Sequence, residues 1–209
     1  MTFAELQADV RRKLNESSAT FWTDQDIKDA LNEAYEEMGD ATEFYERQAT
    51  LIMLAKRTYY DLTSLLPDTF LSPRRCWNTI TQRWARPTDP LDQDLHTSVQ
   101  WELTNGPPEA YFIRGNWWLG VWPRSASDAD SSLRFYYTAI PARMSASTDV
   151  PGFPQEFHPG IVALALSDLL AQERETRKAL GYWNTGQEYG HALRAHVEGR
   201  QRIAKMDVL

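Results

Sequence analysis

The chain of 209 residues is long enough to bury a substantial core, and its 42% hydrophobic and 24% charged residues are typical of a soluble globular protein. A formal net charge of −7 argues against a general nucleic-acid binder, which needs a basic face. The single cysteine, Cys76, excludes an internal disulfide and a cysteine-based zinc site and fits assembly in a reducing cytoplasm, while no segment resembles a signal peptide or a membrane span.

The first predicted elements are two helices with clear start signals. Thr2 and Glu5 have the spacing of a capping box before an apolar-striped helix that ends near Leu14. Residues 21–38 predict a second helix, in which Thr23 is a natural N-cap followed by acidic residues in the first turn. Its apolar residues recur at three- and four-residue steps, which places them on one face. They are Ile27, Ala30, Leu31, Ala34, Tyr35 and Met38.

The negative charge of the chain is concentrated in these helices. Residues 1–47 hold 12 Asp and Glu against 5 Lys and Arg, whereas residues 48–154 hold 10 of each kind and residues 155–209 hold 7 of each. The acidic excess is therefore either a solvated helix face, a surface that repels DNA, or a surface that meets a basic partner.

The middle of the chain changes to short strands rich in Trp and Thr. Strands are expected at 50–54, 58–62, 75–79, 81–86 and 133–139, with a short helix over 91–99.

The clearest β signal is a hairpin over residues 111–122. Gly115 at the first central position suits a two-residue type II′ turn, which places Ile113 opposite Trp118 and Phe112 opposite Leu119. Both faces of this hairpin are apolar, so we expect it to be covered on two sides.

Helices return after the irregular segment 141–154. Residues 155–177 predict a helix that is apolar almost all round between Ile161 and Leu166, as expected of a helix buried on several sides. Gly181 is expected to end or bend this segment. The final helix carries Tyr182, Tyr189, His196 and Ile203 at seven-residue intervals.

These elements predict an α+β fold. Residues 1–47 and 154–209 both need a partner for their apolar faces, so we expect them to pack together as one helical bundle. Residues 48–153 would then project from the bundle as an antiparallel β-rich insertion.

Motifs for catalysis or metal binding are missing from the sequence. There is no H-E-x-x-H, nucleophile elbow, P-loop or dinucleotide fingerprint, and His191 and His196 are five residues apart, not the four that put two ligands on one helical face. Cys76 has Arg74 and Arg75 nearby, which could lower the pKa of its thiol, but a structural role is expected. We therefore expect that the protein is not an enzyme and that it binds no metal ion and no cofactor.

Six of the eight tryptophans fall in the β region, at Trp77, Trp84, Trp101, Trp117, Trp118 and Trp122. Aromatic side chains on a sheet can stack sugars or unpaired bases, but base binding would also need a basic groove, and this region is neutral. Packing in the core and contact between subunits are the simpler uses of such large side chains.

Short motifs occur in a fixed order along nearly the whole chain, after an N-terminal helix of residues 2–11. They are Phe21–Ile27, Ala30–Tyr35, Tyr59–Leu62, Leu66–Phe70, Gly106–Tyr111, Leu119–Pro123, Leu133–Tyr137, Val150–Pro151 and Pro154–Phe157, followed by the long Ala/Leu helix. In this order and spacing the chain resembles the head–tail connector proteins of tailed bacteriophages, the adaptor or head-completion family that docks beneath the portal.

The resemblance implies a structural virion protein at the head–tail interface, assembled in the host bacterial cytoplasm. Such proteins form a homo-oligomeric ring, typically of twelve copies, that contacts the portal protein and tail or stopper proteins. Double-stranded DNA passes through the ring without specific binding, and no membrane, cofactor or catalytic residue is implied. The alternative that the residues leave open is a tail-associated carbohydrate- or receptor-binding module that uses the aromatic β region.

A ring requires a heterologous interface, in which one surface of each subunit meets a different surface of the next. The expected contacts are Trp117, Trp118 and Trp122 in the β region and Tyr182, Tyr189 and His196 on the last helix. Glu33 and Glu37 are expected to face the channel, where like charge keeps DNA from sticking. Ile203, Met206 and Leu209 are candidate portal contacts at an end that orders on binding.

Overall fold

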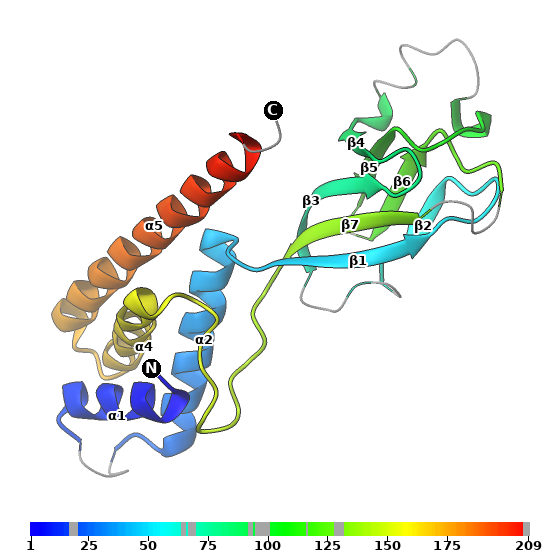
Figure 1. Ribbon diagram of the computed structural model, residues 1–209. Coiled ribbons are helices and arrows are strands. Elements are labelled where there is room, and N and C mark those ends of the chain that lie inside the picture. Colours follow the sequence, from blue (N-terminus) through cyan, green and yellow to red (C-terminus); the bar gives the residue numbers. More distant parts are fainter. Residues whose placement is uncertain are drawn as a thin grey trace. The chain divides into compact units, whose positions relative to one another are not determined.

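The fold is α+β, as the sequence predicts, with helices toward both ends of the chain and strands between them (Figure 1). The computed structural model describes residues 1–16, 21–63, 66, 70–91, 94, 101–115, 117–127 and 132–206, with side chains up to residue 200. The chain divides into two compact units, one of Met1–Tyr45 with Ile140–Leu209 and one of Glu46–Ala139. We call them the helical unit and the β unit.

The helical unit contains α1 (Phe3–Leu14), α2 (Asp24–Thr42), α4 (His158–Gln172) and α5 (Thr176–Met206), with a short 3-10 turn, η2 (Gln155–Phe157), before α4. The predicted start signals of the first two helices are confirmed. Thr2 and Glu5 form a complete capping box, and Thr23 forms one with Asp26. Each box satisfies backbone N–H groups that have no acceptor inside the helix.

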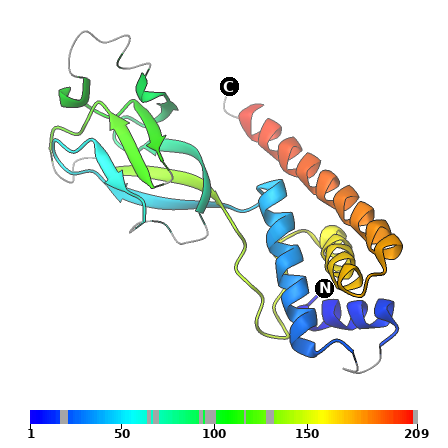
Figure 2. The ribbon, with the colours of Figure 1, turned by 180° about the vertical axis from the view of Figure 1, so that it is seen from behind.

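The core of the helical unit is built around α4, which contacts α1, α2 and α5 (Figure 2). Most of its residues are buried, which explains why its sequence is apolar almost all round. The largest fully buried side chains of this core are Phe3, Leu6, Ile27, Leu31, Met38, Ile161 and Leu166.

The boundary between the last two helices differs from the prediction. The helix ends at Gln172 and residues 173–175 are not helical. Arg174 adopts a left-handed conformation there, with φ of 65°, and α5 begins at Thr176. Gly181, which was expected to end or bend the preceding helix, lies inside α5.

The segment 140–153 belongs to the helical unit. From its sequence it was expected in the β-rich insertion of residues 48–153. Two of its side chains, Met144 and Phe153, belong to the helical core. Its backbone is held by the buried side chain of Asn32, which donates to the carbonyl of Met144 (3.1 Å) and accepts from the Met144 N–H (2.8 Å).

The β unit is one seven-stranded sheet with the order β1-β7-β3-β4-β5-β6-β2. Its strands are β1 (Glu46–Ile52), β2 (Tyr59–Asp61), β3 (Phe70–Asn78), β4 (Arg83–Pro87), β5 (Ala110–Arg114), β6 (Trp118–Trp122) and β7 (Ser132–Ala139), with a 3-10 turn η1 at Trp101–Leu103. All neighbours are antiparallel except β4 and β5. Because β1 and β2 are consecutive in the chain yet occupy opposite ends of the order, the sheet curls (Figure 1).

The curled sheet encloses its own core, separate from that of the helices. This core includes Leu51, Met53, Leu62, Cys76, Leu119, Leu133 and Phe135. The predicted helix over 91–99 lies mostly outside the described residues.

The predicted hairpin exists as β5 and β6, but its predicted register is wrong by one residue. Ile113 lies opposite Leu119, and Phe112 lies opposite Gly120. Since Arg114 pairs with Trp118, the loop between the strands has three residues, 115–117, not two. The left-handed Gly115, with φ of 60°, starts this loop.

Candidate interaction surfaces

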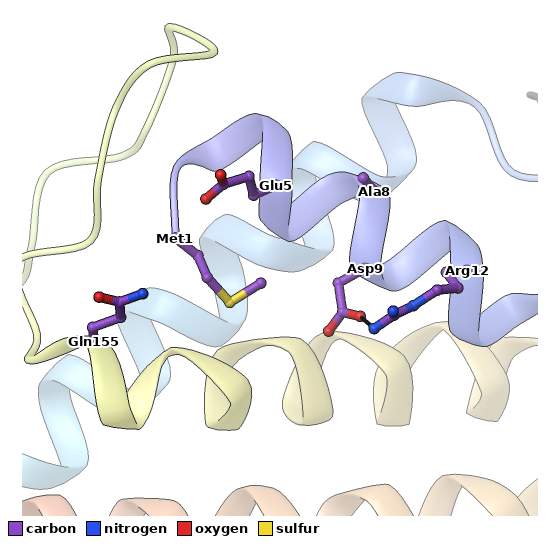
Figure 3. Close-up of a pocket in the computed structure, with 6 residues that line it drawn as sticks. All are labelled: Met1, Glu5, Ala8, Asp9, Arg12 and Gln155. Atoms are coloured by element: carbon purple, nitrogen blue, oxygen red, sulfur yellow. Dashed lines mark hydrogen bonds and ion pairs between the residues drawn. The ribbon is translucent and has the colours of Figure 1, made fainter.

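A shallow groove lies along α1, where Figure 3 shows Met1, Glu5, Ala8, Asp9 and Arg12 together with Gln155. Its charged groups already have partners within the fold. The Glu5 carboxylate accepts the N–H of Thr2 (2.8 Å), and Asp9 forms ion pairs with Arg12 and with Lys13 (3.3 Å). Glu5 caps the start of α1, and Asp9, Arg12 and Lys13 pair on its surface. Among the described residues of this groove, no unpaired acid lies next to an unpaired base, as an acid–base catalytic site would need.

The buried titratable side chains His158 and Cys76 have structural roles. His158 is buried, and its Nε2 lies 2.9 Å from the Phe153 carbonyl. Burial raises the pKa of the Cys76 thiol, so Arg74 and Arg75 do not activate it. Across the described ranges, no three His, Cys, Asp or Glu residues come together where they could hold a metal ion.

The outer side of α2 is a stripe of acidic side chains. Glu36 forms a bidentate ion pair with Arg143, whose Nε and a terminal guanidinium nitrogen donate to the two carboxylate oxygens at 2.8 and 3.0 Å. Asp26, Glu33, Glu37 and Asp40 are exposed and form no ion pair in the described part of the chain. We call the exposed and half-buried acids of this side the acidic stripe, which consists of Asp26, Asp29, Glu33, Glu36, Glu37 and Asp40.

Glu33 and Glu37, predicted to face a channel, lie together on this stripe. They line a groove of about 260 Å³ with Asp168 of α4 and Trp183 of α5. Partial burial of the carboxyl group in this groove and the negative charge of Asp168 raise the pKa of Glu37. The groove therefore brings three carboxylates together, none of which forms an ion pair within the described residues.

The predicted stripe on α5 is turned largely toward its own unit. Tyr182 and Tyr189 are half-buried against the helical core, and the His196 ring meets the edge of Phe157 at 5.7 Å between centroids. Their role in a subunit interface stays a prediction. Two other apolar side chains of α5, Leu180 and Trp183, are exposed. They were not predicted, because they lie outside the seven-residue repeat of Tyr182, Tyr189 and His196.

The predicted tryptophan contacts separate into two kinds. Trp117 and Trp118, at the loop end of β6, expose 38% and 46% of their surface. Trp122 is half-buried at the other end of the strand, and its indole N–H has no acceptor among the described residues. Of the predicted portal contacts, Ile203 and Met206 lie in α5, but their side chains and all of Leu209 fall outside the described part.

A second group of side chains on the β unit was missed by the sequence reasoning. Arg75 of β3 has its guanidinium carbon 4.7 Å from the ring centre of Trp84 and 5.0 Å from that of Tyr136, which places it between two aromatic rings. Trp77 packs edge-on against Trp84, with 4.9 Å between centroids. The alternation of Arg75 and Trp77 along one strand was the available signal, since such residues share a face of the sheet.

The sequence model of a family described as SU10 adaptor protein matches residues 1–204, which span both units. No curated protein matches the chain. The family match confirms the resemblance to phage head–tail adaptors that the ordered motifs indicate. No described helix is both long and apolar enough to cross a membrane.

Proposed function

Because the chain belongs to the SU10 adaptor protein family, a family of phage structural adaptors, we propose that its copies form a ring beneath the portal. The ring links capsid to tail, is typically of twelve copies, and lets the genome pass. The observation that carries this proposal is the family match over residues 1–204, because it spans the helical unit and the β unit together. The protein then resides at the head–tail interface of the virion after assembly in the host cytoplasm.

Surfaces of different character support a ring, since each subunit must use one surface to meet a different surface of its neighbour. Exposed aromatic side chains supply binding energy at such contacts. In the β unit we assign this role to Trp117, Trp118 and the half-buried Trp122. On α5 we assign it to the exposed parts of Tyr182, Tyr189 and His196, whose remaining surface packs inward.

The acidic groove supports a role for Glu33 and Glu37 at the DNA channel. Basic side chains hold the phosphate backbone strongly at low salt, whereas negative ones repel it. Both carboxylates lie beside Asp168 and form no ion pair in the described part of the chain, so the groove would stay negative while DNA passes. Near the C-terminus of the sequence we assign Ile203, Met206 and Leu209 to the portal contact.

The test of the ring is assembly on the portal. The purified chain is mixed with purified portal rings and imaged by electron microscopy, with tail or stopper protein added in a second arm. We expect a layer of adaptor subunits with the symmetry of the portal, to which the stopper then binds. Portal rings that remain bare at saturating adaptor concentration would reject the proposal.

The exposed tryptophans also suit carbohydrate binding by a tail-associated module, because sugars stack on flat aromatic rings. Trp84 is a poor platform for this purpose, since the guanidinium of Arg75 lies over its ring. Trp117 and Trp118 remain available. Binding to a glycan array that is lost in Trp117→Ala or Trp118→Ala, with no binding to portal, would favour this second function.

A further inference from the structure

The outer side of strands β7, β3 and β4 joins arginines to aromatic rings. We call it the Arg–aromatic face and define it by Arg75, Trp77, Trp84, Arg86, Arg134 and Tyr136. The strand register brings these residues together: Arg75 lies opposite Tyr136, and Trp77 lies opposite both Trp84 and Arg134. The face is thus one continuous surface across three neighbouring strands.

Part of this face is held rigid by contacts within the β unit. Arg75 is fixed between Trp84 and Tyr136 and also pairs with Glu46 at 3.2 Å. The guanidinium of Arg75 and the two rings thereby form one pre-organised layer, in which Trp84 still exposes 41% of its surface. Such a layer loses little conformational freedom when a partner binds.

The remaining arginines of the face keep their positive charge available. Arg86 and Arg134 are exposed and form no ion pair within the described ranges. Arg86 lines a pocket of about 410 Å³ with Trp84, Arg83, Thr81, Pro108 and Glu109. An exposed guanidinium beside an apolar ring suits a carboxylate, which it can bind through two hydrogen bonds.

The same chain carries a matching acidic surface on α2. At 100° per residue the acidic stripe spans an arc of about 100°, with Glu36, Asp29 and Asp40 toward one edge and Glu37 at the other. Asp40 is exposed without an ion pair in the part of the chain described, and Asp29 accepts a hydrogen bond from Gln25 (2.9 Å). Arg143 pairs with Glu36 and lies near Asp29 and Glu33. Asp40 and the charge left over on this edge are therefore what a basic surface would meet.

We propose that the Arg–aromatic face of one copy binds the Asp29–Asp40 side of the acidic stripe in a second copy. This inference rests on the proposed ring, since it adds a charged contact between neighbouring subunits to the aromatic contacts assigned above. Residues 1–47 hold seven more acids than bases, so charge complementarity favours this occupant. Nucleic acid is a weaker match, because residues 48–154 hold equal numbers of acidic and basic residues.

Two complementary variants test the contact. In Arg86→Glu/Arg134→Glu the Arg–aromatic face becomes acidic, and in Asp29→Lys/Asp40→Lys the stripe becomes basic. Each variant alone brings like charges together, so we expect at least a tenfold weaker self-association than wild type by sedimentation velocity, and no ring on the portal. An equimolar mixture restores opposite charges at every contact and should recover assembly.

The matched control is Glu156→Lys/Glu188→Lys, which makes the same charge change at exposed positions of the helical unit outside α2 and should assemble like wild type. Circular dichroism spectra identical to wild type exclude misfolding of any variant. If each of the two variants assembles as strongly as wild type, or if their mixture does not recover assembly, the inference is overturned. The proposed ring would not be affected by that result. Wild-type protein that forms no ring with or without portal overturns the proposed function instead. A fluorescent DNA duplex bound by wild type and lost in Arg86→Glu/Arg134→Glu, with assembly unchanged, would make the face a nucleic-acid site and also overturn the inference.

Discussion

Gly160 of α4 lies directly against Tyr189 of α5. A Cβ atom added at position 160 would come within 2.5 Å of the Tyr189 Cβ, which is closer than real side chains approach. The two helices can pack this tightly only because position 160 has no side chain. The contact brings the Tyr189 side of α5 against α4, where Tyr189 is half-buried against the helical core.

Gly160→Ala should therefore destabilise the helical unit by about 1–3 kcal/mol, because the added methyl group must push α5 away. Gly190→Ala is the matched control. This glycine lies inside α5, and a methyl group added there meets no described atom within 4 Å, so alanine should stabilise the helix by about 0.5–1 kcal/mol. Urea unfolding followed by circular dichroism at the helical band measures both. Equal stability of the two variants would contradict the close packing.

The helices could be predicted from the sequence because their signals are local. The capping boxes at Thr2 and Thr23 and the apolar spacing of α2 need only neighbouring residues. The direction in which the α5 stripe points was not predictable in this way. It involves contacts such as that of Tyr189 with Gly160, which is 29 positions away in the chain and comes close only in the folded structure.

The sheet and its surfaces were harder to predict for the same reason. The hairpin register depended on whether its loop has two or three residues, and one residue changes every cross-strand pair. The Arg–aromatic face joins Arg75 to Tyr136, which are paired only through the order of β3 and β7. No periodicity along a single strand specifies that neighbour.

Asn32→Ala should destabilise the helical unit by about 2–4 kcal/mol. The substitution removes two hydrogen bonds and leaves both the N–H and the carbonyl of Met144 buried without their partner. The matched control is Gln25→Ala on the same helix, whose only described side-chain bond, to Asp29, is exposed. This control should change stability by less than about 0.5 kcal/mol. Chemical unfolding of both variants gives the comparison, and a neutral Asn32→Ala would show that segment 140–153 is held by other contacts.

The stability of the helical unit should fall as the pH drops below about 6.5, in part because of His158. Burial lowers the pKa of this side chain in the folded state, so the unfolded chain takes up the proton first. The free energy of unfolding therefore decreases from about pH 6.5 down to the lower folded pKa.

His158→Gln removes this titration and should flatten the dependence of the urea midpoint on pH. Glutamine can still donate to the carbonyl of Phe153, but the 2.9 Å contact of the His158 Nδ1 with the Met1 amino group is lost, so the readout is the slope with pH and not the absolute stability. The control is His191→Gln on the exposed side of α5, which changes no buried contact and should keep the wild-type dependence. An identical pH profile for wild type and His158→Gln would disprove the contribution.

Cys76 should react with a thiol reagent only after the β unit opens. Its side chain is fully buried in the core of the sheet, and burial raises the pKa of the thiol, so little thiolate is present. We expect labelling of the native chain to be at least about a thousandfold slower than labelling in urea. Ala126→Cys adds an exposed thiol and should give one rapidly labelled site per native chain. Rapid labelling of wild type would show that the core of the sheet opens readily.

Glu33→Lys/Glu37→Lys should slow DNA ejection from phage particles without preventing their assembly. The two lysines would place positive charge where the groove beside Asp168 is now negative, and each new lysine–phosphate pair steepens the salt dependence of DNA binding by about 0.9 in log–log slope. Ejection is triggered in vitro and followed by dye binding to released DNA at low and high salt, where screening should restore the wild-type rate. Glu188→Lys, an exposed site on α5, is the control for a general change in charge. Unchanged ejection and DNA retention at low salt would place Glu33 and Glu37 away from the channel.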